Sequence, residues 1–320
     1  MMRFLLTLMI ALVAASPGVA QPTMQDPVQI SDIGRTPPNG PCQYPCNRVA
    51  VIFIHGITGD STTWSNGTVE WPKLLADDSD LQTELGTALD VYRVDYFSQL
   101  NEGPSVTTIN KNLSAKLDEK LFGRPLGGRG YSKIVLVCHS LGGILCRNYL
   151  LHVKLRWGHA FLSLFRATIT LGTPLEGSDL ANLTLVRASS NEQVRVLRPI
   201  DFNDFLQLLH ESTQEFTQKR QTLGCPEVQF YAGYEMRDTP LVEGIPFPTL
   251  RIVSQQSATA GVQHTKGFDK NHRELVKPAN RSDAVYDWVR GILRTCGPNG
   301  GACSAAIDRT CGRPSWLSTP

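Results

Sequence analysis

The chain has 320 residues, of which 41% are hydrophobic and 19% charged, and its formal net charge is +2. This composition is typical of a globular protein with a large core, and the length fits one α/β domain or two small ones. The near-neutral charge and the lack of a long basic run argue against a nucleic-acid-binding protein.

The first 20 residues have the pattern of a secretory signal peptide. Arg3 precedes an apolar run from Phe4 to Ala15, and Gly18-Val19-Ala20 supplies small residues where a signal peptidase cuts. We therefore predict cleavage after Ala20 and export to the periplasm or the medium. The alternative is a retained membrane anchor, but the run is short for a spanning helix. No second apolar stretch is long enough to cross a bilayer.

Residues 21–47 are rich in Pro, Gln and Asp and are interpreted as an extended N-terminal arm. The near-continuous apolar run 48–55 that follows predicts a strand covered on both faces. This strand enters a glycine-rich turn over 55–60, and such a turn lets backbone N–H groups face a ligand. The alternative is a tight turn that binds no ligand and has only a structural role.

Strand and helix patterns then alternate, which predicts a parallel sheet with right-handed crossovers. The strand patterns have consecutive apolar residues, and the helix patterns repeat apolar residues every three or four positions. The predicted elements are a helix at Lys73–Ala76, a strand at 89–96, a helix with Ile109, Leu113, Leu117 and Leu121 on one face, a strand at 133–138, a helix through 144–150, and a strand at 166–171.

The alternation pauses over residues 176–224, which contain two amphipathic segments and no strand pattern. We predict a helical cap over the carboxyl end of the sheet, with a plain pair of packing helices as the equal alternative. Strands resume at 228–234 and 249–253, and a helix through 284–292 closes the domain. The α/β domain is therefore placed at 48–294, with a Cys-rich tail at 295–320.

The eight cysteines divide by context. Cys138 and Cys146 lie within a strand–turn–helix pattern and are predicted to be buried thiols. Export makes disulfides possible for the six others, whose pairing the sequence does not fix. A local Cys42–Cys46 loop is our hypothesis, and a zinc site is disfavoured because no His lies at ligand spacing. The remaining peripheral cysteines are Cys225, Cys296, Cys303 and Cys311.

Ser140 stands between a buried-strand pattern and a helix pattern, followed by Gly142 and Gly143. This stretch resembles the G-x-S-x-G nucleophile elbow of α/β-hydrolases, except that Cys138 replaces the first glycine. In that turn the serine hydroxyl projects from the sheet and the helix N-terminus offers N–H groups to an oxyanion. A buried βα unit with an incidental serine is the alternative.

A serine nucleophile needs a base and an acid, and in this fold they follow it in the order acid, then His. Two histidines, His264 and His272, follow the last predicted strand. Glu235 directly ends the strand before it and is the preferred acid, with Asp238 as the alternate and a sheet-edge salt bridge as its alternative role. The other histidines beside turns, His55 and His139, are expected to orient loops.

The oxyanion should be held by two backbone N–H groups. One belongs to Leu141, directly after the nucleophile. The other belongs to Ile57, in the turn after the early strand. Side-chain identity matters little at these two positions, because only the main chain is used.

Further motifs resemble the lipase and esterase type of α/β-hydrolase, in particular the GPI-inositol-deacylase-like and serine-active-site-containing hydrolases. They are Phe53–Gly59, the Thr63-Trp64 and Trp71-Pro72 pairs, His139–Gly143, Leu171–Ser178, and Asn271-His272 with Val276-Lys277-Pro278. The similarity to the family's Asp-His pair before a Lys-Pro assigns the base to His272, with His264 as the alternate. Asn271 replaces the family's Asp here. The resemblance covers about residues 48–294.

These features predict an exported serine hydrolase that cleaves small-molecule or lipid-like carboxylic esters through Ser140, His272 and Glu235. The mechanism needs no metal or organic cofactor, and transient contact with a lipid surface is expected. A thioesterase or acyltransferase on the same site is one alternative. A catalytically inactive binding protein of the same fold is the other, and the oligomeric state is left open.

Overall fold

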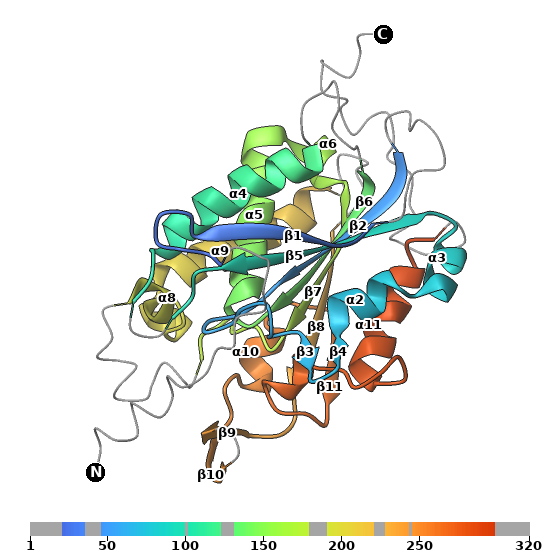
Figure 1. The fold of residues 1–320 in the computed structure, drawn as a ribbon. Helices are drawn as coiled ribbons and strands as arrows, with labels where there is room; N and C mark the ends of the chain where they lie inside the picture. The colour runs from blue at the N-terminus through green and yellow to red at the C-terminus, as the bar shows by residue number, and fades with distance from the viewer. Residues whose placement is uncertain are drawn as a thin grey trace.

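The computed structural model describes residues 21–35, 46–99, 102–122, 131–178, 191–220, 228–242 and 245–297. A seven-stranded sheet forms its centre, in the order β1-β5-β2-β6-β7-β8-β11 (Figure 1). β1 is antiparallel to β5, and the remaining neighbours are parallel. The strands are β1 (Val28–Arg35), β2 (Cys46–Ile54), β5 (Ala88–Tyr96), β6 (Tyr131–His139), β7 (Phe165–Leu171), β8 (Gln229–Glu235) and β11 (His264–Phe268).

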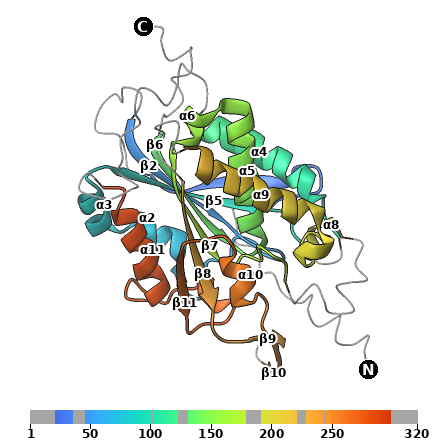
Figure 2. The same ribbon diagram turned by 180° about the vertical axis from the view of Figure 1, so that it is seen from behind.

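Helices cover both faces of this sheet (Figures 1 and 2). On one face lie α4 (Val106–Phe122), α5 (Leu141–Trp157) and α9 (Asp204–Arg220), and on the other lie α2 (Trp71–Ala76), α3 (Ser79–Leu85) and α11 (Ala284–Arg294). Each face buries its own apolar cluster, so the central strands are apolar in consecutive positions. The fold is therefore the predicted α/β-hydrolase architecture, with a mainly parallel sheet between two helical layers.

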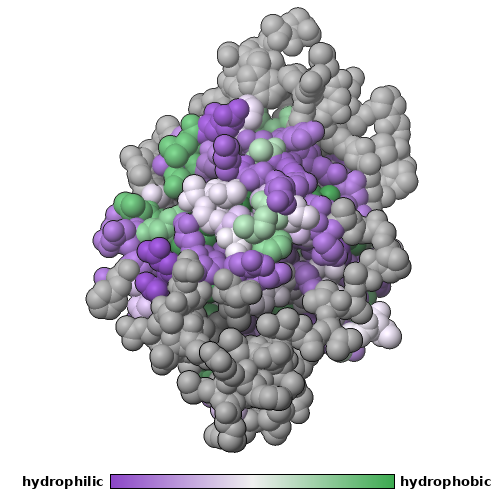
Figure 3. Space-filling model, turned by 60° about the vertical axis from the view of Figure 1, so that its left-hand side comes forward, coloured by the Kyte–Doolittle hydropathy of each residue, from purple (hydrophilic) through white to green (hydrophobic). Residues whose placement is uncertain are grey.

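The remaining elements are short. They are β3 (Ser65–Asn66), β4 (Val69–Glu70), α6 (His159–Leu162), α8 (Glu192–Arg195), η3 (Ile200–Phe202), β9 (Thr239–Val242), β10 (Ile245–Leu250), α10 (Gln255–Thr259) and η5 (Glu274–Val276). The residues coloured in Figure 3 are mainly hydrophilic, with hydrophobic residues in small separate patches. Within the described ranges, every helix is too short or too polar to serve as a membrane span.

The N-terminal arm contributes a strand to the main sheet. Residues 28–35, predicted as part of an extended arm outside the domain, form β1 at the sheet edge. Two ion pairs attach this segment to α4, between Lys116 and Asp26 at 2.6 Å and between Lys120 and Asp32 at 2.5 Å. The sheet therefore begins before residue 48. The predicted signal peptide, residues 1–20, lies outside the described residues.

The predicted strand at 249–253 is wrong, because the last strand of the main sheet is β11. Residues 249–250 instead end β10, which pairs with β9 in a separate two-stranded sheet. Pro246 and Pro248 explain this placement, since proline cannot donate to the ladder of a central strand. β11 pairs parallel to β8, and its first three side chains are exposed, so it lacks an apolar run.

Part of the segment between β7 and β8, where a cap over 176–224 was predicted, is helical. The described residues of this range are 176–178 and 191–220, and 191–220 contains α8, η3 and α9. Leu206 and Leu209 of α9 join the core against α5, whereas Leu208 is 63% exposed. At the other end, Gln193 donates to the main-chain oxygens of Phe97 and Pro104, both at 3.2 Å. The described part of the cap is therefore packed on the body of the domain.

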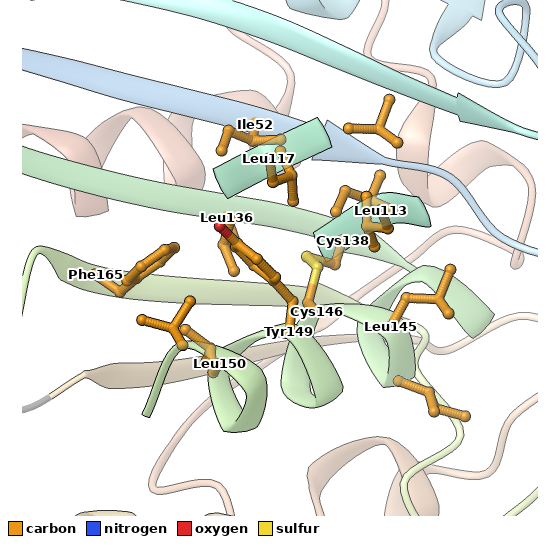
Figure 4. Packing of buried hydrophobic residues seen from close by; sticks show 14 of the residues in the cluster. Ile52, Leu113, Leu117, Leu136, Cys138, Leu145, Cys146, Tyr149, Leu150 and Phe165 are labelled. Carbon is orange, nitrogen blue, oxygen red and sulfur yellow. A yellow bond between two sulfur atoms is a disulfide. The ribbon is translucent and has the colours of Figure 1, made fainter. Parts of the chain in front are cut away.

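Cys138 and Cys146 form a disulfide, so the prediction of two free thiols is wrong (Figure 4). Helix α5 folds back along β6 after the elbow, and this brings the two residues together inside the apolar core. Cys296 is also disulfide-bonded. The hypothesis of a Cys42–Cys46 loop falls on Cys42, which lies outside the described residues, as do Cys225, Cys303 and Cys311.

Candidate active site

Ser140 occupies a strained turn between β6 and α5. Its φ of 50° and ψ of −126° are unfavourable for any residue except glycine, and such strain is typical of functional turns. The turn is tight because main chains meet there. A Cβ at Gly56 would lie 2.6 Å from Cβ of Ser140, and one at Gly142 would collide with the main-chain oxygens of Ile54 and His55. The two glycines therefore let the Gly56 turn and the first turn of α5 meet at Ser140.

His55 fixes the turn that faces Ser140. Its Nε2 accepts from the N–H of Tyr96 at 3.0 Å, so its Nδ1 carries the proton and donates to the Gly56 oxygen at 2.8 Å. Burial lowers the pKa of His55, which keeps the ring neutral in this role. The Gly56 oxygen and the Ile57 N–H belong to one peptide plane, so the hydrogen bond also sets the direction of that N–H.

The predicted oxyanion donors lie at two adjoining turns. Ile57 follows Gly56, whose main chain touches Ser140, and Leu141 is the first residue of α5. Among the described residues, neither backbone N–H donates to an acceptor. Two N–H groups on either side of a serine are thus free for a ligand oxygen.

Glu235 and His272 form a buried pair at the carboxyl ends of β8 and β11. Nδ1 of His272 lies 3.0 Å from Oε1 of Glu235, which also accepts from the N–H of Val253 at 2.9 Å. Burial alone would raise the pKa of the Glu235 carboxyl, but the charge of His272 and these hydrogen bonds outweigh it and lower that pKa. Glu235 is therefore a carboxylate that accepts from Nδ1 of His272, and in the neutral form of that ring Nε2 is an acceptor.

The pair lies against the turns that surround Ser140. A Cβ at Gly172, which has a φ of +55°, would lie 2.8 Å from Oε2 of Glu235 and 2.9 Å from Nδ1 and Cε1 of His272. The residue before it, Leu171, accepts a hydrogen bond from the N–H of Ser140 at 2.9 Å. His139 also touches His272. No hydrogen bond joins Ser140 and His272 directly, and such contacts are often long without a substrate.

A family model described as the alpha/beta hydrolase family matches residues 51–282. The chain belongs to the alpha/beta hydrolase family. It is also similar to the protein SERAC1 of Bos taurus (24% identity) and of Homo sapiens (23% identity), over 76% of this chain in both cases. The chain spans 38% of the length of these relatives.

Solved structures with a similar fold include a Bacillus licheniformis lipase, BlEst2 in its mature form, at 19% identity and a TM-score of 0.45. That match covers 83% of this chain and 97% of the lipase. The phospholipase PlaB of Legionella pneumophila is similar at 20% identity and a TM-score of 0.45, over 59% of this chain and 38% of that protein.

The alternate site residues of this alpha/beta hydrolase lie away from the His272 pair. Asp238 forms an ion pair with Arg251 at 2.8 Å, and its side chain is 48% exposed. His264 is the first residue of β11, is exposed, and stacks on Tyr231 at 5.0 Å between ring centroids. Neither bonds to Glu235 or His272 in the described structure.

Asn271, which departs from the Asp-His pair of the similar hydrolases, has a structural role. Its Oδ1 accepts from the N–H groups of Arg273 and Glu274, at 3.1 Å and 3.0 Å, and so caps the turn after His272. Within the described ranges, no three His, Cys, Asp or Glu side chains gather in a way that would hold a metal ion.

Two contacts of the Glu235–His272 pair were not predicted from the sequence. One is the N–H of Val253, which binds Glu235, and the other is the Thr239 hydroxyl, which accepts from the N–H of His272 at 3.0 Å. Both belong to the segment between β8 and β11, where the strand prediction was wrong. Val253 contributes only its main chain, so its side chain carries no signal in the sequence.

Proposed function

We propose that this protein is a serine hydrolase of carboxylic esters, with Ser140 as nucleophile, His272 as base and Glu235 as the acid that orients it. The observation that carries the proposal is the buried hydrogen bond between Glu235 and His272, beside the strained turn of Ser140. A buried carboxylate that accepts from Nδ1 of a histidine leaves Nε2 ready to take a proton from a serine hydroxyl.

In this mechanism Nε2 of His272 takes the Ser140 proton as Oγ attacks the acyl carbon. The carbonyl oxygen becomes an oxyanion, which the N–H groups of Ile57 and Leu141 stabilise. The tetrahedral intermediate expels the alcohol, which takes the proton from His272, and an acyl-enzyme forms. Water, deprotonated by the same base, then attacks the acyl carbon, releases the acid and restores the Ser140 hydroxyl.

The proposed substrate is a small-molecule or lipid-like ester, and the proposed location is the periplasm or the medium. Transient contact with a lipid surface would follow from a lipid-like substrate. The N-terminal apolar run supports export, and so does the Cys138–Cys146 disulfide, because disulfides persist in oxidising compartments. Thioester hydrolysis and acyl transfer use the same residues and belong to the same proposal.

A panel of p-nitrophenyl esters with increasing acyl length tests the proposal. The wild type should turn over part of the panel, and Ser140→Ala and His272→Ala should each lower kcat by about 10³-fold or more. His264→Ala, the matched control, should stay within about twofold of the wild type. If His264→Ala is inactive and His272→Ala is not, the base is His264. No turnover by the folded wild type would support the inactive binding protein.

A further inference from the structure

His139 is buried between the nucleophile turn and the loop that carries the candidate base. It is the last residue of β6, directly before Ser140, and is 7% exposed. Its Nε2 lies 3.2 Å from the main-chain oxygen of His272, and the two ring centroids are 4.7 Å apart. The residue beside the nucleophile therefore contacts both the main chain and the ring of His272.

This hydrogen bond determines the protonation state of His139. A carbonyl oxygen only accepts, so Nε2 of His139 carries the proton and donates it. Nδ1 is then an acceptor, and it is buried without a donor among the described residues. Burial holds the pKa of His139 well below its usual value, and the neighbouring His272, His55 and Lys277 lower it further. His139 is therefore a neutral donor with one N–H.

His272 needs such support because it lies in the loop after β11 rather than on a strand. Three contacts hold it. Its N–H donates to the Thr239 hydroxyl at 3.0 Å, its Nδ1 donates to Glu235 at 3.0 Å, and its main-chain oxygen accepts from His139. The first two come from β8 and the segment after it. The third comes from the strand that ends in the nucleophile.

We infer that His139 is a positioning residue, whose Nε2–H ties the main chain of His272 to the strand that presents Ser140. The inference rests on the proposed function, since Ser140 and His272 must be the reacting pair. Because both ends of the proton transfer are then attached to β6, the distance between Ser140 Oγ and His272 Nε2 is held constant. A shift of about 1 Å between reacting groups lowers a rate on the order of 10²-fold.

Two substitutions distinguish the effect of the N–H donor of His139 from the effect of its bulk. His139→Gln keeps an N–H group at about the reach of Nε2, and His139→Leu removes it at similar size. With an ester that the wild type cleaves, His139→Leu should lower kcat about 10- to 10²-fold and leave KM within about twofold. His139→Gln should recover kcat to within about fivefold of the wild type.

His152→Leu is the matched control. His152 lies on α5 and binds Asp118 at 2.9 Å, so this variant also loses a partly buried histidine hydrogen bond, but one remote from His272. Its melting temperature should fall while kcat stays within about twofold of the wild type. A general loss of stability would instead lower kcat in both leucine variants.

A folded His139→Leu protein with the wild-type kcat overturns the inference, and so does a His139→Gln protein as slow as His139→Leu. Nitrogen-15 NMR of labelled histidines gives a readout without turnover. At pH 7 His139 should show the Nε2–H tautomer, and an Nδ1–H tautomer overturns the inference. If the wild type cleaves no ester, the proposed function fails, and the spectrum still decides whether the hydrogen bond exists.

Discussion

Glu235→Gln removes one negative charge from the position that is proposed to orient the base, His272. Glu235 is completely buried, and its Oε1 accepts from both His272 and Val253. A glutamine oxygen at the Oε1 position still accepts from both N–H groups, but it carries no negative charge. His272 therefore loses the negative charge that stabilises its cation in the transition state.

The size of the effect follows from the distance between the two groups. For unit charges 3.0 Å apart, as Nδ1 and Oε1 are, an effective dielectric constant of about 20 gives an attraction of about 5.5 kcal/mol. Each 1.36 kcal/mol is a factor of about ten in rate, so the loss is on the order of 10⁴-fold in kcat. Asp238→Asn, the control, removes an exposed ion pair with Arg251 and should change kcat less than about twofold.

The assay is the steady-state turnover of a short-chain p-nitrophenyl ester, with circular dichroism to verify that each variant is folded. A folded Glu235→Gln protein within tenfold of the wild-type kcat would refute the role of Glu235. A loss on the order of 10³-fold in Asp238→Asn, with Glu235→Gln nearly intact, would transfer that role to Asp238.

Three other predictions concern a glycine, a capping carboxylate and the disulfide. Gly172→Ala should destabilise the protein by about 1–2 kcal/mol and lower kcat about tenfold or more, because the added Cβ would press on His272. The control is Gly158→Ala, at a φ of +81° with open space around it, which should lose about as much stability but keep the wild-type kcat. Equal kcat values in the two variants would contradict this prediction. Asp78 caps α3 and binds Tyr286 and Arg290 of α11, and its pKa in the folded protein is lowered. Its carboxylate therefore stabilises the folded state at a pH above about 3.9, the ordinary pKa of aspartate. This stabilisation is lost as the pH falls through the lower pKa of the folded state. The free energy of unfolding in urea should therefore be about 1–3 kcal/mol lower for Asp78→Asn than for the wild type at pH 7, and nearly equal below pH 3. An equal difference at both pH values would show that the carboxylate charge is not responsible. Replacing Cys138 and Cys146 by alanine should lower the unfolding free energy by up to about 2.5 kcal/mol, as expected for a sequence separation of 8, and an unchanged denaturant midpoint would exclude this contribution.

The central strands could be predicted from the sequence because a parallel sheet is covered on both faces. Residues 49–54 and 134–138 are apolar in consecutive positions, and both lie in central strands. β11 could not be predicted, because it is an edge strand with three exposed residues among five. β1 was missed as a strand for a similar reason, since only its pairing with β5 distinguishes it from an extended arm.

The candidate site was only partly predictable for a related reason. The turn of Ser140 is local in the sequence, so a short motif indicates it. Glu235 and His272 are 37 residues apart, and their contact depends on β8 and β11 being neighbours, which the chain order of a family supplies and local patterns do not. The disulfide was missed because Cys138 and Cys146 lie in an apolar core, where cysteine is ordinarily a thiol.

The central claim is that Ser140 is an activated nucleophile, and covalent labelling tests it most directly. The folded wild type is treated with a fluorophosphonate, and the adduct is located by peptide mass spectrometry. The proposed function predicts one adduct per chain, on Ser140, and none in Ser140→Ala. An unlabelled wild type, or a label that persists in Ser140→Ala, would contradict it.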